Sequence, residues 1–285
     1  MSGGCAPSGP GNPNAEQQSG PGAFDLGAHL AGLLIYAMED PAKAEPLGWF
    51  IIFSVKGERR LSLQDLAKGH ASLPDGHWKK GDDPRSLMAA VPVFSIAHGG
   101  ELLTEPRELV GVDWGGPDHY FTLFDAMTDR LPFMIDRAES YWDVIQDWYS
   151  TPPPEPGMEK VCRQYAALYN RELYYEAYKL LEMRWMTEEG PGKDLLRGLM
   201  QLALGLHQIE TGKFAMQQLE EAYGRIRTGR EVFPFPTAER FLKRLEKATR
   251  LIKAYGPDQF QTFDLKMFPK VWLESPWKKL FRFGR

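Results

Sequence analysis

Five side chains that could serve an active site or a buried hydrogen-bond network lie in two neighbouring stretches of the chain. Glu176, Tyr178 and Glu182 belong to the stretch LYYEAYKLLEMRW. Gln201 and His207 belong to the stretch DLLRGLMQLALGLHQIETG. On a helix, Tyr178 and Glu182 share a face because they are four residues apart, whereas Glu176 points elsewhere. The first stretch is therefore either an active-site helix or a packing helix.

The second stretch, residues 194–212, predicts a helix that other helices enclose. Residues 198–209 include no charged side chain, and apolar residues occur all round the helical wheel. A helix of that composition is normally buried. If Gln201 or His207 is buried, it must find hydrogen-bond partners. The nearest source of such partners is the first stretch, residues 173–185.

The two stretches carry a pair of sequence motifs. The residues that match the first motif are Tyr169, Asn170, Tyr174, Tyr175, Glu176, Ala177, Leu181, Glu182 and Trp185. Those that match the second are Gly198, Leu199, Gln201, Leu202, Ala203, Leu206, His207 and Gly212. Through these residues, the segment from about 158 to 227 resembles domain-of-unknown-function family 309, a prokaryotic helical family sometimes labelled predicted metal-dependent hydrolases. The resemblance implies a helical fold and, through that label, a divalent metal.

The departures from the family's pattern fall on its polar positions. Tyr178 and Lys179 stand where the family has His-Glu, and Gln208 replaces the second histidine of a pair. Replacing histidine by tyrosine removes an imidazole ligand, and replacing glutamate by lysine puts a cation beside the ion. Because a hydrolytic metal site usually needs about three N or O ligands and an open position for water, these changes weaken the expectation of catalysis.

Two functions follow from these residues. The favoured one is a non-catalytic binding or scaffolding protein, in which a buried Glu182–His207 pair, completed by Gln201 and Tyr178, pins the helices together. The alternative, implied by the resemblance, is a metal-dependent hydrolase that uses Glu176, Glu182 and His207. In that alternative Glu182 and His207 are the metal ligands.

The proline-rich stretch TPPPEPG, residues 151–157, divides the chain because consecutive prolines bar a helix from running through it. Residues 23–150 are expected to form a small α/β domain, and the residues after the linker an all-α helical bundle, so the fold class is α+β. Residues 28–38 read as a buried element. The expected strands are 48–55, 88–97, 108–114 and 131–136, the expected helices are 118–130 and 138–149, and the expected exposed loop is 68–86.

The bundle is expected at residues 158–256 and ends with an amphipathic helix at 238–255. Turns at Asn170 and Gly212 also resemble helical-hairpin repeats of the tetratricopeptide kind, which would imply protein binding. Residues 257–285 form a basic and aromatic tail. From residue 265 on, it has six basic residues against one acidic residue. It is therefore either a docking arm for an acidic partner or membrane surface, or a segment whose Trp and Phe residues pack back across the other domain while its charges stay in solvent. The second reading is favoured, and a protein partner is expected through a groove of the bundle or through residues 265–285.

Bulk composition narrows the class of protein. With a net charge of −4 and a pI near 5.9, the chain lacks the basic surplus of nucleic-acid-binding proteins, so no nucleic acid is expected. No apolar run approaches the roughly 20 residues of a membrane span, and residues 1–22 have neither the charge nor the apolar run of a signal peptide. Their Gly, Pro and Ser content predicts disorder. Two cysteines, Cys5 and Cys162, give no disulfide framework, and the expected location is the cytoplasm.

Overall fold

The computed structural model describes residues 25–73, 84–98, 101–104, 119–150 and 154–272. The strand predicted at 108–114 and the disorder predicted for residues 1–22 lie outside these ranges. The same is true of the predicted tail from residue 273 onward.

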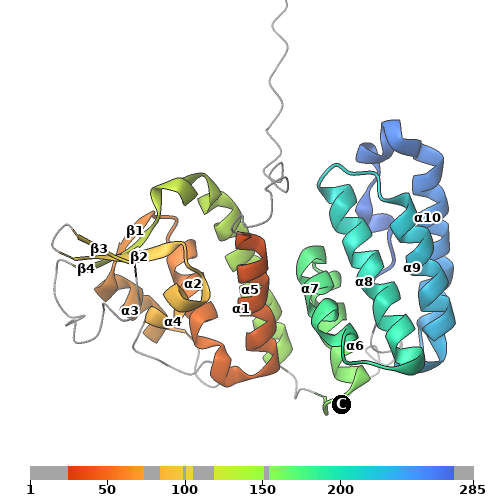
Figure 1. Ribbon diagram of the computed structural model, residues 1–285, viewed down its shortest axis with the longest axis horizontal. Coiled ribbons are helices and arrows are strands. Elements are labelled where there is room, and N and C mark those ends of the chain that lie inside the picture. The colour runs from red at the N-terminus through yellow and green to blue at the C-terminus, as the bar shows by residue number, and fades with distance from the viewer. Residues whose placement is uncertain (1–24, 74–83, 99–100, 105–118, 151–153, 273–285) are drawn as a thin grey trace, which may run out of the picture.

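The N-terminal half combines helices with a small antiparallel sheet, which lies at the left end of the molecule in Figure 1. Its helices are α1 (Leu26–Glu39), α2 (Glu45–Val55), α3 (Leu63–Ala71), α4 (Arg85–Ala90) and α5 (Leu131–Tyr149), with 3-10 turns η1 (Pro41–Lys43) and η3 (Asp125–Arg130). Its strands are β1 (Arg60–Ser62), β2 (Phe94–His98), β3 (Glu101–Leu103) and β4 (His119–Leu123), in the order β1-β4-β2-β3.

The strand predicted at 48–55 is wrong, because this segment is helix α2. A continuous apolar run fits a fully buried helix as well as a buried strand. Here Pro46 stands in the first turn, where proline suits a helix, and Trp49 Nε1 donates a hydrogen bond to Glu45 Oε1 one turn earlier, at 3.3 Å. Helix α2 covers the sheet with Phe53, whose ring centroid lies 5.1 Å from that of Phe94.

The segment 118–136 has the two element types in the reverse of the predicted order. Residues 119–123, predicted as helix, are the inner strand β4, in which Phe121 pairs with Leu61 of β1 and with Ile96 of β2. Residues 131–136, predicted as a strand, open helix α5, with a proline in its first turn. The helix predicted at 138–149 continues α5 and is confirmed. Residues 119–123 form a strand because β1 and β2 pair with them. Residues 131–136 were misassigned because six residues are too few to show the helical period of α5.

Two further predictions in this half are partly correct. The strand predicted at 88–97 is the end of α4 followed by β2. The loop predicted at 68–86 begins inside α3 and ends inside α4, while residues 74–83 lie outside the described part of the chain. The buried element predicted at 28–38 is helix α1.

The C-terminal half is helical, so the α+β fold class is confirmed. Its helices are α6 (Met158–Tyr169), α7 (Tyr174–Trp185), α8 (Gly190–Glu210), α9 (Met216–Thr228) and α10 (Ala238–Gln259), with 3-10 turns η4 (Gly229–Val232), η5 (Phe260–Thr262) and η6 (Leu265–Met267). Helix α8 packs against α7 and α9, and residues 192–209 include no exposed side chain. The prediction of an enclosed central helix is therefore confirmed.

The end of α10 and the segment after it can be compared with the predictions for residues 238–255 and 265–285. The regular part of α10 stops at Gly256, where φ is +69° and a proline follows. Among residues 265–272 of the predicted tail, Phe268 and Val271 are buried, so this part packs back on the bundle. No helix in the described part of the chain has the length and apolar character needed to cross a membrane.

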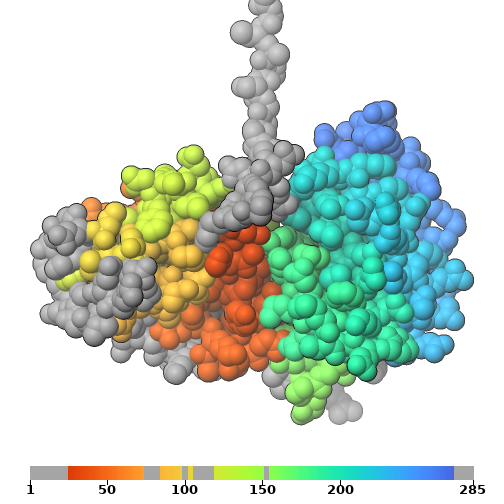
Figure 2. Space-filling view, in the orientation of Figure 1, coloured from red at the N-terminus to blue at the C-terminus, as the bar shows by residue number. Residues whose placement is uncertain are grey.

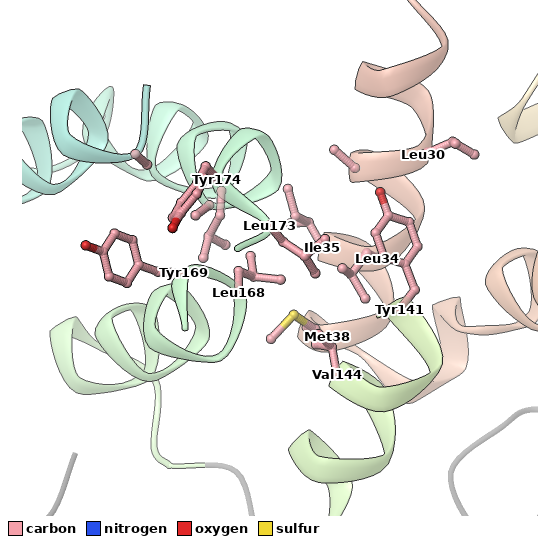
Figure 3. Packing of buried hydrophobic residues seen from close by; sticks show 14 of the residues in the cluster. Leu30, Leu34, Ile35, Met38, Tyr141, Val144, Leu168, Tyr169, Leu173 and Tyr174 are labelled. Carbon is pink, nitrogen blue, oxygen red and sulfur yellow. The ribbon is translucent and has the colours of Figure 1, made fainter. Parts of the chain in front are cut away.

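The two halves share one buried apolar cluster. Helix α1 packs directly on α7, and Figure 2 shows the two halves in close contact along this line. Figure 3 shows the cluster from close by: side chains of α1 and α5 meet side chains of α6 and α7. The labelled members are Leu30, Leu34, Ile35, Met38, Tyr141, Val144, Leu168, Tyr169, Leu173 and Tyr174. The helix that carries Glu176, Tyr178 and Glu182 is therefore placed between the N-terminal half and α8.

Candidate functional site

Glu176 lies in the first turn of α7 and faces the N-terminal half. Its side chain is 2% exposed. Its Oε1 accepts a hydrogen bond from the Tyr141 hydroxyl at 2.7 Å and lies 3.4 Å from Nε of Arg137, an ion pair. Both partners belong to α5. We call Arg137, Tyr141 and Glu176 the interface triad, because it joins the two halves of the chain.

The charges of the interface triad are balanced within it. Burial and the neighbouring Glu176 carboxylate raise the pKa of Tyr141 well above its usual value, so the phenol keeps the proton that it donates. Burial alone would lower the pKa of Arg137, but the acidic groups around it, with Glu176 the strongest, together outweigh burial and raise the pKa above its ordinary value. Arg137 also lies over the ring of Phe133, 5.2 Å from its centroid. A buried carboxylate needs such compensation.

Tyr178 and Glu182 form a separate contact on the outer face of α7. The Tyr178 hydroxyl donates to Glu182 Oε1 at 2.5 Å, and Lys179 Nζ lies 2.9 Å from Glu182 Oε2. Burial alone would raise the pKa of Glu182, but the hydrogen bonds from Tyr178 and Lys179 outweigh this effect, so the pKa lies below its ordinary value. Burial and the same hydrogen bond raise the pKa of Tyr178 to about 12. Because the Glu182 side chain is 39% exposed, this is a surface ion pair within one helix.

His207 and Gln201 lie on α8 and have other neighbours. The ring of His207 packs on Tyr175 of α7, with 5.2 Å between centroids, and its Nδ1 lies 3.5 Å from Glu210 Oε2. Gln201 Nε2 donates to Glu221 Oε2 of α9 at 2.6 Å. The structure thus brings α7 and α8 side by side, but it gives Glu182 and His207 different partners.

These positions do not fit the divalent metal that the family's label implies. Within the described residues, no three or more His, Cys, Asp and Glu side chains are grouped so that they could hold a metal ion. Glu176 is engaged by Tyr141 and Arg137 from the other half of the chain. Glu182 has a lysine ammonium where an ion would sit. Burial raises the pKa of the Cys162 thiol of α6 to about 12, so this thiol stays protonated.

A second polar cluster between the halves was missed by the sequence reasoning. Glu39, the last residue of α1, accepts a hydrogen bond from Gln164 Nε2 at 3.0 Å and lies 3.0 Å from Lys160 Nζ. Arg184 of α7 donates to the same carboxylate. Burial alone would raise the pKa of Glu39, but the hydrogen bonds from these three residues outweigh this effect, so the pKa lies below its ordinary value. We call Glu39, Lys160, Gln164 and Arg184 the Glu39 cluster.

The signals for these two clusters in the sequence are weak. Lys160 and Gln164 share a face of α6 because they are four residues apart, but nothing in that spacing points to a carboxylate at the end of α1. A third contact closes the same interface, since the Tyr175 hydroxyl donates to Asp25 Oδ2 at 2.7 Å. Three polar side chains of α7, those of Tyr175, Glu176 and Arg184, thus contact residues that precede the proline-rich linker.

Comparisons with known proteins identify the helical segment only. The model of the family Domain of unknown function (DUF309) matches residues 162–217, which run from α6 through α7 and α8 to the start of α9. Neither the curated proteins nor the solved structures include a significant match to the chain. The resemblance inferred from the two motifs is therefore confirmed for a helical DUF309 segment that contains Glu176, Tyr178, Glu182, Gln201 and His207.

Proposed function

We propose that the protein is a non-catalytic binding or scaffolding protein in which the DUF309 segment is locked onto the N-terminal half. The observation that carries this proposal is the interface triad. Glu176 stands at a glutamate position of the family's motif, and here it is almost fully buried and held by the hydroxyl of Tyr141 and the guanidinium of Arg137. A carboxylate in that setting contributes to packing, since it has no open side from which a substrate could approach.

The remaining polar groups support the same function. A catalytic ligand set needs several donors that converge on one open position. Glu176 points to α5, Glu182 is bonded within its own helix, and His207 packs on Tyr175 of α7. The Glu39 cluster and the shared apolar cluster add further contacts between the halves. A rigid pair of halves suits a protein that presents a fixed surface to a partner. We also propose a cytoplasmic location and no nucleic-acid ligand, as the composition indicates.

The metal content of the purified full-length protein tests the proposal. The protein is dialysed against metal-free buffer and then against buffer with Zn²⁺, Mn²⁺ or Fe²⁺, and the bound metal is measured by mass spectrometry. A scaffolding protein retains far less than one ion per chain, and His207→Ala changes the stability but not the metal content. Stoichiometric metal that is lost in both His207→Ala and Glu182→Gln would overturn the proposal in favour of the hydrolase.

A further inference from the structure

A shallow pocket opens where the start of α10 meets the segment that follows η6. Its lining residues are Thr237, Arg240, Phe241, Arg244, Pro269, Lys270 and Trp272, and we call it the basic pocket. The hollow itself measures only about 10 Å³, close to the space that one water molecule needs. Small-molecule sites usually enclose about 300–1,000 Å³. The basic pocket therefore cannot enclose a cofactor, and a bound peptide would lie across its rim.

The floor of the basic pocket is fixed by hydrogen bonds from the bundle. Asn170 holds Val271 at both ends of its backbone: Nδ2 donates to the Val271 carbonyl and Oδ1 accepts from the Val271 amide, each at 2.8 Å. Thr237 Oγ1 donates to the carbonyl of Trp272, also at 2.8 Å. Val271 is buried, whereas its two neighbours, Lys270 and Trp272, are exposed. The pocket is therefore preformed, with a cation and an indole ring held at its edge.

The cations of the basic pocket have no acidic partner among the described residues. Arg240 and Arg244 are one turn apart on α10 and exposed, and Lys270 faces them from the other wall. Further along the same helix, Arg250 is paired with Glu246 and Lys253 with Glu220. Residues 238–272 include eight Lys and Arg against four Asp and Glu, in a chain whose net charge is −4. This segment thus carries a net positive charge in a chain that is negative as a whole.

The basic pocket also offers apolar surface. Trp272 supplies it, since it is 45% exposed, whereas Phe241 of the pocket wall is buried. Guanidinium groups bind carboxylates through paired hydrogen bonds, and a half-exposed tryptophan is a typical anchor at protein interfaces. The combination is complementary to a segment that has carboxylates on either side of an apolar residue.

We propose that the basic pocket binds an acidic peptide segment of a partner protein. Aspartate or glutamate side chains of the segment pair with Arg240, Arg244 and Lys270, and an apolar side chain packs on Trp272. The inference rests on the proposed binding function and names the class of partner. The chain's own ends do not supply such a segment: residues 273–285 have four basic residues and one acidic residue, and residues 1–24 have a single acidic residue.

Nucleic acid and anionic membranes share some of this chemistry, but they fit less well. Both are extended polyanions that would meet the whole negatively charged molecule, and their binding normally needs a broad basic surface. A short peptide contacts the basic pocket alone. The observations therefore favour the peptide, and the other two anions become outcomes of the test.

The test is a peptide-display selection on the full-length protein. Random peptides are selected against the wild type, against the double variant Arg240→Glu, Arg244→Glu, and against a control with the same charge change, Lys56→Glu, Lys213→Glu. The control positions are exposed and lie outside the basic pocket. Thermal melting establishes that each variant is folded. We expect the wild type and the control to enrich peptides rich in Asp and Glu, and the pocket variant to lose that enrichment.

The strongest peptide is then synthesised and titrated by fluorescence anisotropy. The pocket variant should bind it at least about tenfold more weakly, because like charges replace opposite ones across the interface, while the control binds as the wild type does. The proposal is overturned if acidic peptides are not enriched or if the pocket variant retains the affinity. It is also overturned if phosphatidylserine vesicles or single-stranded RNA bind more tightly than the peptide and depend on Arg240 and Arg244. Metal content is measured separately, so the failure of the proposed function is recognised independently.

Discussion

Glu176 and Glu182 are six residues apart on one helix, and their surroundings differ completely. Glu176 is 2% exposed and held by two residues of the other half of the chain. Glu182 is 39% exposed and bonded to its own helix. The two carboxylates match the same family motif, yet only the first connects distant segments. The difference teaches that burial and long-range partners, rather than residue type, decide which of these side chains the fold depends on.

The largest effect should come from neutralising the buried carboxylate. Glu176→Gln leaves Arg137 buried without its counter-charge, which typically costs about 3–5 kcal/mol of unfolding free energy. Glu182→Gln, the matched change on the outer face, should cost about 1 kcal/mol or less, as exposed ion pairs do. Urea unfolding followed by circular dichroism measures both. An equal loss of unfolding free energy in the two variants would contradict the claim that the fold depends on Glu176 and not on Glu182.

The hydroxyl groups that face the two carboxylates extend the comparison. Tyr141→Phe removes the 2.7 Å hydrogen bond to Glu176 and should destabilise the protein by about 1.5–3 kcal/mol, the usual contribution of a hydrogen bond to a charged group. Tyr178→Phe removes the equivalent bond at the surface, where water replaces it, and we expect a smaller loss. If Tyr178→Phe proved the more damaging variant in urea unfolding, the assignment of the buried contact would be wrong.

Two glycines, one tightly packed and one at the surface, allow the same comparison of a buried with an exposed position without a change of charge. A Cβ atom at Gly198 of α8 would lie 2.8 Å from the backbone nitrogen of Ile226, whereas one at Gly224 of α9 would meet no atom within 4 Å. Gly198→Ala should therefore force α8 and α9 apart and cost about 1–3 kcal/mol. Gly224→Ala should stabilise the helix by about 0.5–1 kcal/mol. Melting temperatures that shift in the same direction would refute the close approach of α8 and α9.

The smallest effect should be a pH dependence that originates in the Glu39 cluster. The hydrogen bonds from Arg184, Lys160 and Gln164 outweigh burial and lower the pKa of Glu39. Its stabilising contribution is therefore complete above the ordinary carboxyl pKa of about 4.3, and it is lost as the pH falls through the lowered pKa of the folded state.

Urea unfolding at a series of acidic pH values measures this contribution. Glu39→Gln should show a shallower loss of stability in acid than the wild type. The control Glu58→Gln, at an exposed position with no ion-pair partner among the described residues, should keep the wild-type dependence. If Glu39→Gln lost stability in acid as steeply as the wild type, the Glu39 cluster would contribute nothing to the pH dependence of stability.

The sequence predicted the helical half better than the mixed half, for a physical reason. The charge-free run of α8 and the amphipathic stripe of α10 are periodic over many residues, so each indicates its own element and its buried face. The segments that became α2 and β4 are short and apolar, and their state depends on neighbours. Helix α2 is enclosed on all sides, and β4 is a strand because β1 and β2 pair with it.

The sequence predicted which two helices pack together, but not the contacts that their polar side chains make. The motifs led to α7 and α8, which do pack together. The partner of Glu176, however, is Tyr141, 35 residues earlier and on the other side of the linker, and Glu39 pairs with Lys160, 121 residues away. No local spacing indicates such pairs, because they form only when the two halves are packed.

A double-mutant cycle between Tyr141 and Glu176 tests the central claim most directly. The unfolding free energies of the wild type, Tyr141→Phe, Glu176→Gln and the double variant are measured in urea at neutral pH. If the interface triad locks the halves together, the two losses are not additive, with a coupling of about 1 kcal/mol or more, within the range for residues in contact. Additive losses would contradict the account, because they would mean that Glu176 does not depend on the other half of the chain.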